Sequence, residues 1–163
     1  MVVSPEKLAK HILDAHTAKD KSFVDIEEII KTLGIRIYRY EFSKTGISGL
    51  FTWEQGKPVI CVNSMHSKER QRFTMAHELY HYYRNLKDKS VLRMSTSASA
   101  TLEERQANKF AALVLMPEDK VKSSRSRSVR TMARSFRVSE EAMEIRVKEI
   151  MLEIIADRNP CLE

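Results

Sequence analysis

The run His77-Glu78-Leu79-Tyr80-His81 constrains this chain more than any other segment of the sequence. Its two histidines are four residues apart, so on a helix both imidazoles lie on one face and can reach the same small ion. Glu78 lies about 100° further round the helix axis, where its carboxylate can touch a water bound to that ion. The alternative is a surface helix that carries two histidines and an incidental acid. Imidazoles on an apolar face are costly without partners, which favours a metal-binding helix.

The residues around the motif also favour a helix. Ser64 and Ser67 are candidate N-caps, and a polar run of good helix formers follows from Lys68 to Arg72. Apolar residues then recur at three-to-four spacing, and neither glycine nor proline interrupts them before Asn85. An H-E-x-x-H helix of this kind is the arrangement of zinc metallopeptidases, so we expect Zn²⁺ as the cofactor.

Length and composition place the chain among water-soluble globular proteins. Its 163 residues are about one domain in length, and 42% of them are hydrophobic, which is enough for a core. No apolar run approaches the roughly 20 residues of a membrane span, and the start from Met1 to Lys7 lacks the pattern of a secretory signal. Cys61 and Cys161 are too few for a disulfide framework, so we expect free thiols and a cytoplasmic location.

The pattern along the chain predicts a mixture of helices and strands, and hence an α+β fold. Expected helices begin at Ser4-Pro5-Glu6, run from about Asp25 to Leu33, from Thr101 to Leu115, and again after Val138-Ser139. Expected strands are Ile35 to Phe42, Ile47 to Trp53 and Pro58 to Asn63, the last two joined by a turn at Glu54-Gln55-Gly56-Lys57. Leu86 to Ala100 shows little periodicity and is interpreted as a flexible loop or lid, with disorder as the alternative.

Catalytic zinc usually takes three protein ligands, and the residues after His81 supply no third histidine. Glu103 and Glu104, at the start of the next expected helix, are the candidates. Thr101-x-x-Glu104 is also a capping box, in which Glu104 reaches back to the N–H of Thr101 and Glu103 becomes the rival ligand. The chemistry of the residues alone leaves both acids open.

Two longer segments carry a resemblance. Arg70-Gln-Arg-Phe-Thr-Met-Ala-His-Glu-Leu-Tyr-His81, preceded by Val59-Ile-Cys-Val-Asn63, and Glu104-Arg-Gln-Ala-Asn-Lys-Phe-Ala-Ala-Leu-Val-Leu-Met-Pro117 resemble the ImmA/IrrE family of metallopeptidases. Met132 to Met143 is similar to that family's C-terminal helices, and the resemblance covers roughly residues 20 to 150. It implies a zincin-like core with a small β-sheet packed against the H-E-x-x-H helix, plus additional C-terminal helices.

The same resemblance implies a division of the chain and a set of site residues. We expect one domain over residues 1–163, with a core at about 20–117 and a helical basic region at about 118–157. The implied metal ligands are His77, His81 and Glu104, the last because it matches the family's E-x-x-A-N block. Tyr80 departs from the small residue that many members carry there, which would narrow the site.

Within such a site Glu78 would act as general base and then acid for a zinc-activated water. Tyr80, Tyr82, Tyr83 and His66 are all candidate donors to the oxyanion, and the sequence does not choose among them.

The resemblance also implies a substrate, because family members cleave or inactivate helix-turn-helix transcriptional repressors that control mobile elements or stress responses. The leading hypothesis is therefore a cytoplasmic zinc endopeptidase acting on such a repressor. The alternative is a non-proteolytic regulator that binds a repressor, or DNA, through its C-terminal basic helices. Seven basic residues and no acid lie between Lys120 and Arg137, where Thr131 to Lys148 loosely fits a helix-turn-helix. A solvated surface explains this cluster equally well.

Overall fold

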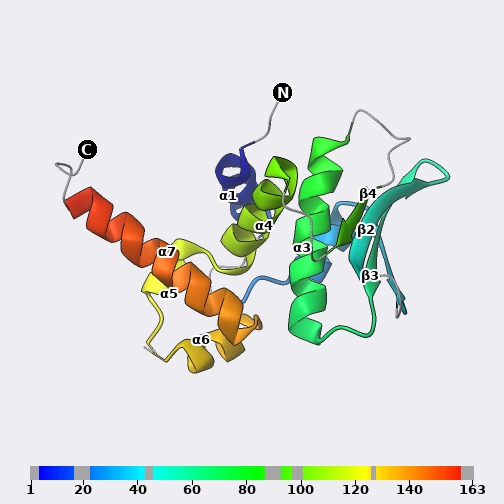
Figure 1. Ribbon diagram of the computed structural model, residues 1–163. Helices are drawn as coiled ribbons and strands as arrows, with labels where there is room; N and C mark the ends of the chain where they lie inside the picture. Colours follow the sequence, from blue (N-terminus) through cyan, green and yellow to red (C-terminus); the bar gives the residue numbers. More distant parts are fainter. Residues whose placement is uncertain are drawn as a thin grey trace.

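The computed structural model describes residues 4–16, 23–42, 46–86, 93–96, 101–125 and 128–158. In Figure 1 the strands form a small sheet at the right, and the helices lie mainly to its left. The helices are α1 (Pro5–His16), α2 (Ile26–Thr32), α3 (Lys68–Arg84), α4 (Leu102–Leu115), α5 (Glu118–Lys122), α6 (Val129–Phe136) and α7 (Glu140–Arg158). The strands are β1 (Arg36–Tyr40), β2 (Ile47–Glu54), β3 (Lys57–Asn63) and β4 (Arg93–Thr96). The fold is therefore α+β, as the sequence predicts.

The strands form one sheet in the order β1-β3-β2-β4. β1 pairs with β3 in parallel, while β2 pairs antiparallel with both β3 and β4. Gln55 and Gly56 connect β2 to β3 with φ values of 49° and 75°, the backbone that a two-residue hairpin turn requires. The predicted turn and hairpin are confirmed.

The prediction of a loop from Leu86 to Ala100 was wrong for residues 93–96, which form β4. These residues lack an apolar alternation, but β2 offers them the backbone hydrogen bonds of an open edge, and Ser95 pairs with Gly49. Residues 87–92 and 97–100 lie outside the described part of the chain, so the interpretation as a lid is not tested there.

Helix α3, the predicted motif helix, lies at the centre of the molecule between the sheet and α4 (Figure 1). The hydroxyl of Ser67 accepts a hydrogen bond from the N–H of Arg70, which selects this serine as the N-cap. Buried side chains run without a break along α3 from Thr74 to His81. On the sheet side, Phe51 and Trp53 of β2 pack against the ring of Tyr82.

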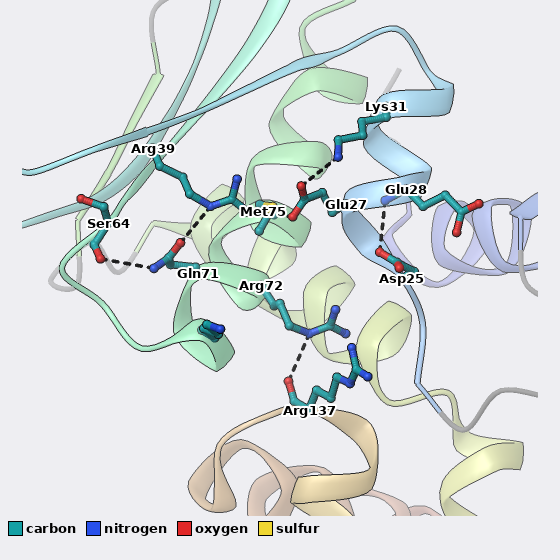
Figure 2. Close-up of a pocket in the computed structure, with 11 residues that line it drawn as sticks. Asp25, Glu27, Glu28, Lys31, Arg39, Ser64, Gln71, Arg72, Met75 and Arg137 are labelled. Carbon is teal, nitrogen blue, oxygen red and sulfur yellow. Dashed lines mark hydrogen bonds and ion pairs between the residues drawn. The ribbon is translucent and has the colours of Figure 1, made fainter.

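The C-terminal helices α5, α6 and α7 are joined to this core by two arginines. Arg146 of α7 is buried, and its Nε donates to the carbonyl oxygen of Met116 at the end of α4, 3.2 Å away. Arg72 of α3 donates to the carbonyl oxygen of Arg137 (Figure 2) and also to that of Val24. One cluster of buried apolar residues extends from α1 to α7. The division into a core at 20–117 and a basic region at 118–157 stays a prediction.

No helix in the described residues has both the length and the apolar character that crossing a membrane requires.

Candidate metal centre

Helices α3 and α4 bring three predicted ligands together. One donor atom from each of His77, His81 and Glu104 lies within 4.8 Å of the other two. The two Nε2 atoms of the histidines are 3.1 Å apart. The two carboxylate oxygens of Glu104 lie 3.1 Å from Nε2 of His77 and 3.2 Å from Nε2 of His81. The group can hold a metal ion, although the identity of that ion does not follow from the geometry.

The outward-facing nitrogens of both imidazoles also have partners. Nδ1 of His77 lies 2.8 Å from Oδ1 of Asn108, and Nδ1 of His81 lies 3.1 Å from Oε1 of Glu103. Both partners offer an oxygen acceptor, so in the neutral tautomer with the proton at Nδ1 each ring turns the lone pair of Nε2 toward Glu104. In this state a cation can bind between the three acceptors, as in metal sites whose ligands are oriented by outer hydrogen bonds.

This geometry separates the roles of the two neighbouring acids. Glu104 faces both inner nitrogens, whereas Glu103 holds the outer nitrogen of His81 and also lies 3.7 Å from the guanidinium of Arg84. The helix start is capped by the hydroxyl of Thr101, which accepts from the N–H of Glu104 at 3.2 Å. One of the two hydrogen bonds expected in the capping box therefore forms, the one that the threonine hydroxyl accepts. The carboxylate of Glu104 instead contacts the two histidines.

Burial and charge act in opposite directions on these groups. Burial lowers the pKa of His77, but the hydrogen bond to Glu104 and the charge of Glu78 outweigh it, so the net pKa is raised. The pKa of His81 is lowered by burial and by the charge of neighbouring His77. The hydrogen bond from His77 lowers the pKa of Glu104, so this carboxylate is ionised at neutral pH. An ionised carboxylate beside two imidazoles is a suitable donor set for a divalent ion.

Glu78, the predicted general base, follows His77 on α3 and is fully buried. It faces β2 at Gly49, where a Cβ would lie 3.4 Å from Oε1 of Glu78 and 2.3 Å from Cγ2 of Thr74. The pairing of β2 with β4 shifts register between Ile47 and Gly49. The absence of a side chain at Gly49 therefore lets an irregular point of the sheet approach α3 beside Glu78, the predicted general base.

The four candidate donors to an oxyanion lie in different environments. The hydroxyl of Tyr80 donates to Oε1 of Gln106 at 3.1 Å, so this side chain is buried between α3 and α4. Tyr82 packs on the sheet, and Tyr83 packs on Tyr82 at a ring distance of 5.2 Å. His66 precedes α3, and burial lowers its pKa. The large ring of Tyr80, which was expected to narrow the site, lies in the interface between α3 and α4. Its centroid is 6.2 Å from that of the His81 ring.

Sequence reasoning missed Asn108 as a partner of His77. The spacing of the residues could have indicated this role, because Asn108 follows Glu104 by four residues and so lies on the same face of α4.

The described residues also form a charged hollow of about 750 Å³, away from the three ligands, between α2, β1 and the start of α3 (Figure 2). Its acidic and basic groups bind each other: Glu27 pairs with both Lys31 and Arg39, and Arg39 also donates to Gln71. The side chains of this hollow thus join α2, β1 and α3.

No curated protein sequence matches the chain. A solved structure described as a Mycobacterium tuberculosis transcriptional regulator has a similar fold, with a TM-score of 0.59 and 16% identity. The likeness covers 85% of this chain and 45% of that one, so the chain spans less than half of the neighbour's length. The family model described as the IrrE N-terminal-like domain (Peptidase_M78) matches residues 30–148, which include the whole candidate metal centre. By this match the chain belongs to the ImmA/IrrE family of metallopeptidases.

Proposed function

We propose that the chain is a cytoplasmic zinc endopeptidase whose substrate is a helix-turn-helix transcriptional repressor. The observation that carries this proposal is the convergence of His77, His81 and Glu104 beside the buried carboxylate of Glu78. The family supports peptidase chemistry, and the neighbour described as a transcriptional regulator supports a role in regulation.

The donor set fits zinc better than the hard cations. Two imidazole nitrogens and one carboxylate are the three ligands of a common type of catalytic zinc site, in which a fourth position stays open for water. Magnesium and calcium prefer sites made of oxygen atoms. The hydrogen bonds from the outer nitrogens to Asn108 and Glu103 fix both rings with Nε2 turned inward, so the ligands are oriented before any ion binds.

When bound, zinc would lower the pKa of a coordinated water to near 7 and polarise the carbonyl of the scissile peptide. The carboxylate of Glu78 would accept the proton of the attacking water and pass it to the amine nitrogen of the leaving strand. Burial of Glu78 excludes bulk water from this transfer. β4 is the outermost strand on the side of Gly49 in the described sheet, so its edge can align an extended substrate by backbone hydrogen bonds.

The first experiment measures metal content by elemental analysis on protein purified without chelator. We expect about one zinc per chain in the wild type, loss of zinc in Glu104→Gln, and retention with weaker binding in the matched variant Glu103→Gln. A wild-type protein that holds no zinc and takes up none when it is added would overturn the proposal.

The second experiment tests the substrate class. A panel of purified helix-turn-helix repressors is incubated with zinc-loaded wild type or Glu78→Gln, and new N-termini are identified by mass spectrometry. We expect a discrete cut in at least one repressor with the wild type alone, while Glu78→Gln keeps its zinc. If Glu78→Gln produces the same biological derepression as the wild type, the protein regulates by binding and the peptidase proposal is wrong.

Direct DNA binding by the C-terminal helices is less favoured by the structure. α6 and α7 do form a helix, turn and helix, but α7 begins with Glu140 and Glu141, which would repel phosphates. Arg130 pairs with Glu140 at 3.0 Å, and the guanidinium of Arg137 lies 3.7 Å from the ring centroid of Phe23. These two arginines are already engaged within the protein.

A further inference from the structure

A groove of about 630 Å³ lies between the first half of α3, the middle of α4 and the first turns of α7. In Figure 1 the start of α7 lies beside the lower end of α3, where this groove is formed. The apolar residues that line it are Phe73, Ala112, Met116, Val138, Ala142 and Ile145.

One residue links the groove to the candidate metal centre. Asn108 lines it and also accepts the hydrogen bond from Nδ1 of His77. Phe73 precedes His77 by one helical turn on the same face of α3, a rise of about 6 Å along the axis. An extended peptide advances about 3.3 Å per residue, so a side chain about two residues from a bond cut at the metal would reach Phe73.

The apolar residues of the lining lie among polar and charged ones, and they offer a surface for apolar groups. Ala112 and Ala142 are small residues on facing helices, and they leave space where larger side chains would close the gap between α4 and α7. Ile145 is 53% exposed at the rim, so much of its apolar surface remains available to a ligand. Charged residues of both signs border the groove on α3 and on α7, and basic residues border it on α4, so no single sign of charge is favoured.

We propose that this groove is a specificity pocket that takes a large apolar side chain, of the size of leucine, isoleucine, methionine or phenylalanine, about two residues from the bond that is cut. This inference rests on the proposed function, because it assigns a substrate feature to the same peptidase site. It adds that the amino-acid sequence of the substrate affects cleavage through residues of the groove, which do not contact the metal.

The test uses zinc-loaded, full-length Glu78→Gln, immobilised and exposed to a synthetic library of 12-residue peptides with randomised central positions. Ile145→Glu places a charge at the rim and Ala142→Trp fills the groove. Leu152→Glu is the matched control, since Leu152 is a 66% exposed residue of the same helix outside the groove. Circular dichroism and zinc content establish that each variant is folded.

We expect the retained peptides to be enriched in large apolar residues, and this enrichment to fall at least tenfold in Ile145→Glu and Ala142→Trp but not in Leu152→Glu. Equal retention by all variants, or retention without apolar enrichment, would overturn the proposal. Cleavage of repressors at unchanged sites and rates by both groove variants would also overturn it, while the proposed function would stand. If the protein binds no zinc, the proposed function fails, and the same capture with metal-free protein decides whether the groove binds apolar peptides.

Discussion

Replacement of Gly49 by alanine tests the contact between β2 and the motif helix. The added Cβ would lie 2.3 Å from Cγ2 of Thr74 and 2.9 Å from the carbonyl oxygen of Cys61. Ordinary carbon contacts begin near 3.5 Å, so the strand and helix would have to separate by about 1.2 Å at this point. Thr74 is β-branched and buried in α3, so its side chain has little freedom to rotate away.

Overpacking of this kind costs about 1–3 kcal/mol of the free energy of unfolding. With a urea dependence of about 2 kcal/mol per molar, the midpoint of unfolding should fall by about 1 M. Because the forced separation lies beside Glu78, it should misplace this carboxylate, and we expect catalysis to fall by more than tenfold while zinc content is kept. Urea titration, elemental analysis and cleavage rates measure the three effects.

A double-mutant cycle identifies the clash as the cause. Thr74→Ser removes only the methyl group that meets the new Cβ, so it should recover part of the lost stability in the Gly49→Ala protein. Recovery should be incomplete, because the contact with the carbonyl of Cys61 remains. We expect a coupling energy of at least 0.5 kcal/mol between the two substitutions. Additive effects, or an unchanged urea midpoint in Gly49→Ala, would refute the close approach of β2 to α3.

Three further predictions concern residues near the site. Asn108→Ala should weaken zinc affinity by about 10- to 100-fold in a chelator competition, because His77 loses its outer acceptor, and an unchanged affinity would contradict that role. Thr101→Ala should cost about 1 kcal/mol of stability in urea titration, since it removes the N-cap of α4; no loss would mean that the cap is formed differently. Burial raises the pKa of Cys61 to about 11, so in a Cys161→Ser background the native thiol should resist alkylation at pH 8 and react only after unfolding. Rapid labelling of the native protein would contradict the buried position of Cys61.

Local signals explain why much of the fold could be predicted from the sequence. Asp25 caps α2 and Gly34 follows its end with a φ of 73°, a conformation that favours glycine. The helix that carries His77 and His81 was also predictable, because the spacing of its residues and the uninterrupted helix formers indicate the same structure.

The missed features depend on contacts between distant segments. Residues 93–96 become a strand only because β2 leaves an edge free to pair, and nothing in their own composition indicates this. Glu103 and Asn108 hold the outer nitrogens of the two histidines, but this follows from how α4 crosses α3. A sequence shows which residues share a helix face, whereas the rotation of one helix against another is set by packing.

The choice between the two acids at the start of α4 depends on this rotation. Glu103 and Glu104 differ by about 100° round the helix axis, so one can face the inner nitrogens of the histidines only if the other faces elsewhere. Gln106 and Phe110 of α4 both contact Tyr80 of α3, and these contacts help to set which side of α4 lies against α3. The hydroxyl of Thr101 accepts a hydrogen bond from the N–H of Glu104, while the carboxylate of Glu104 lies at His77 in the candidate metal centre. Capping and metal binding are therefore compatible at one residue, because the first uses its backbone and the second its side chain.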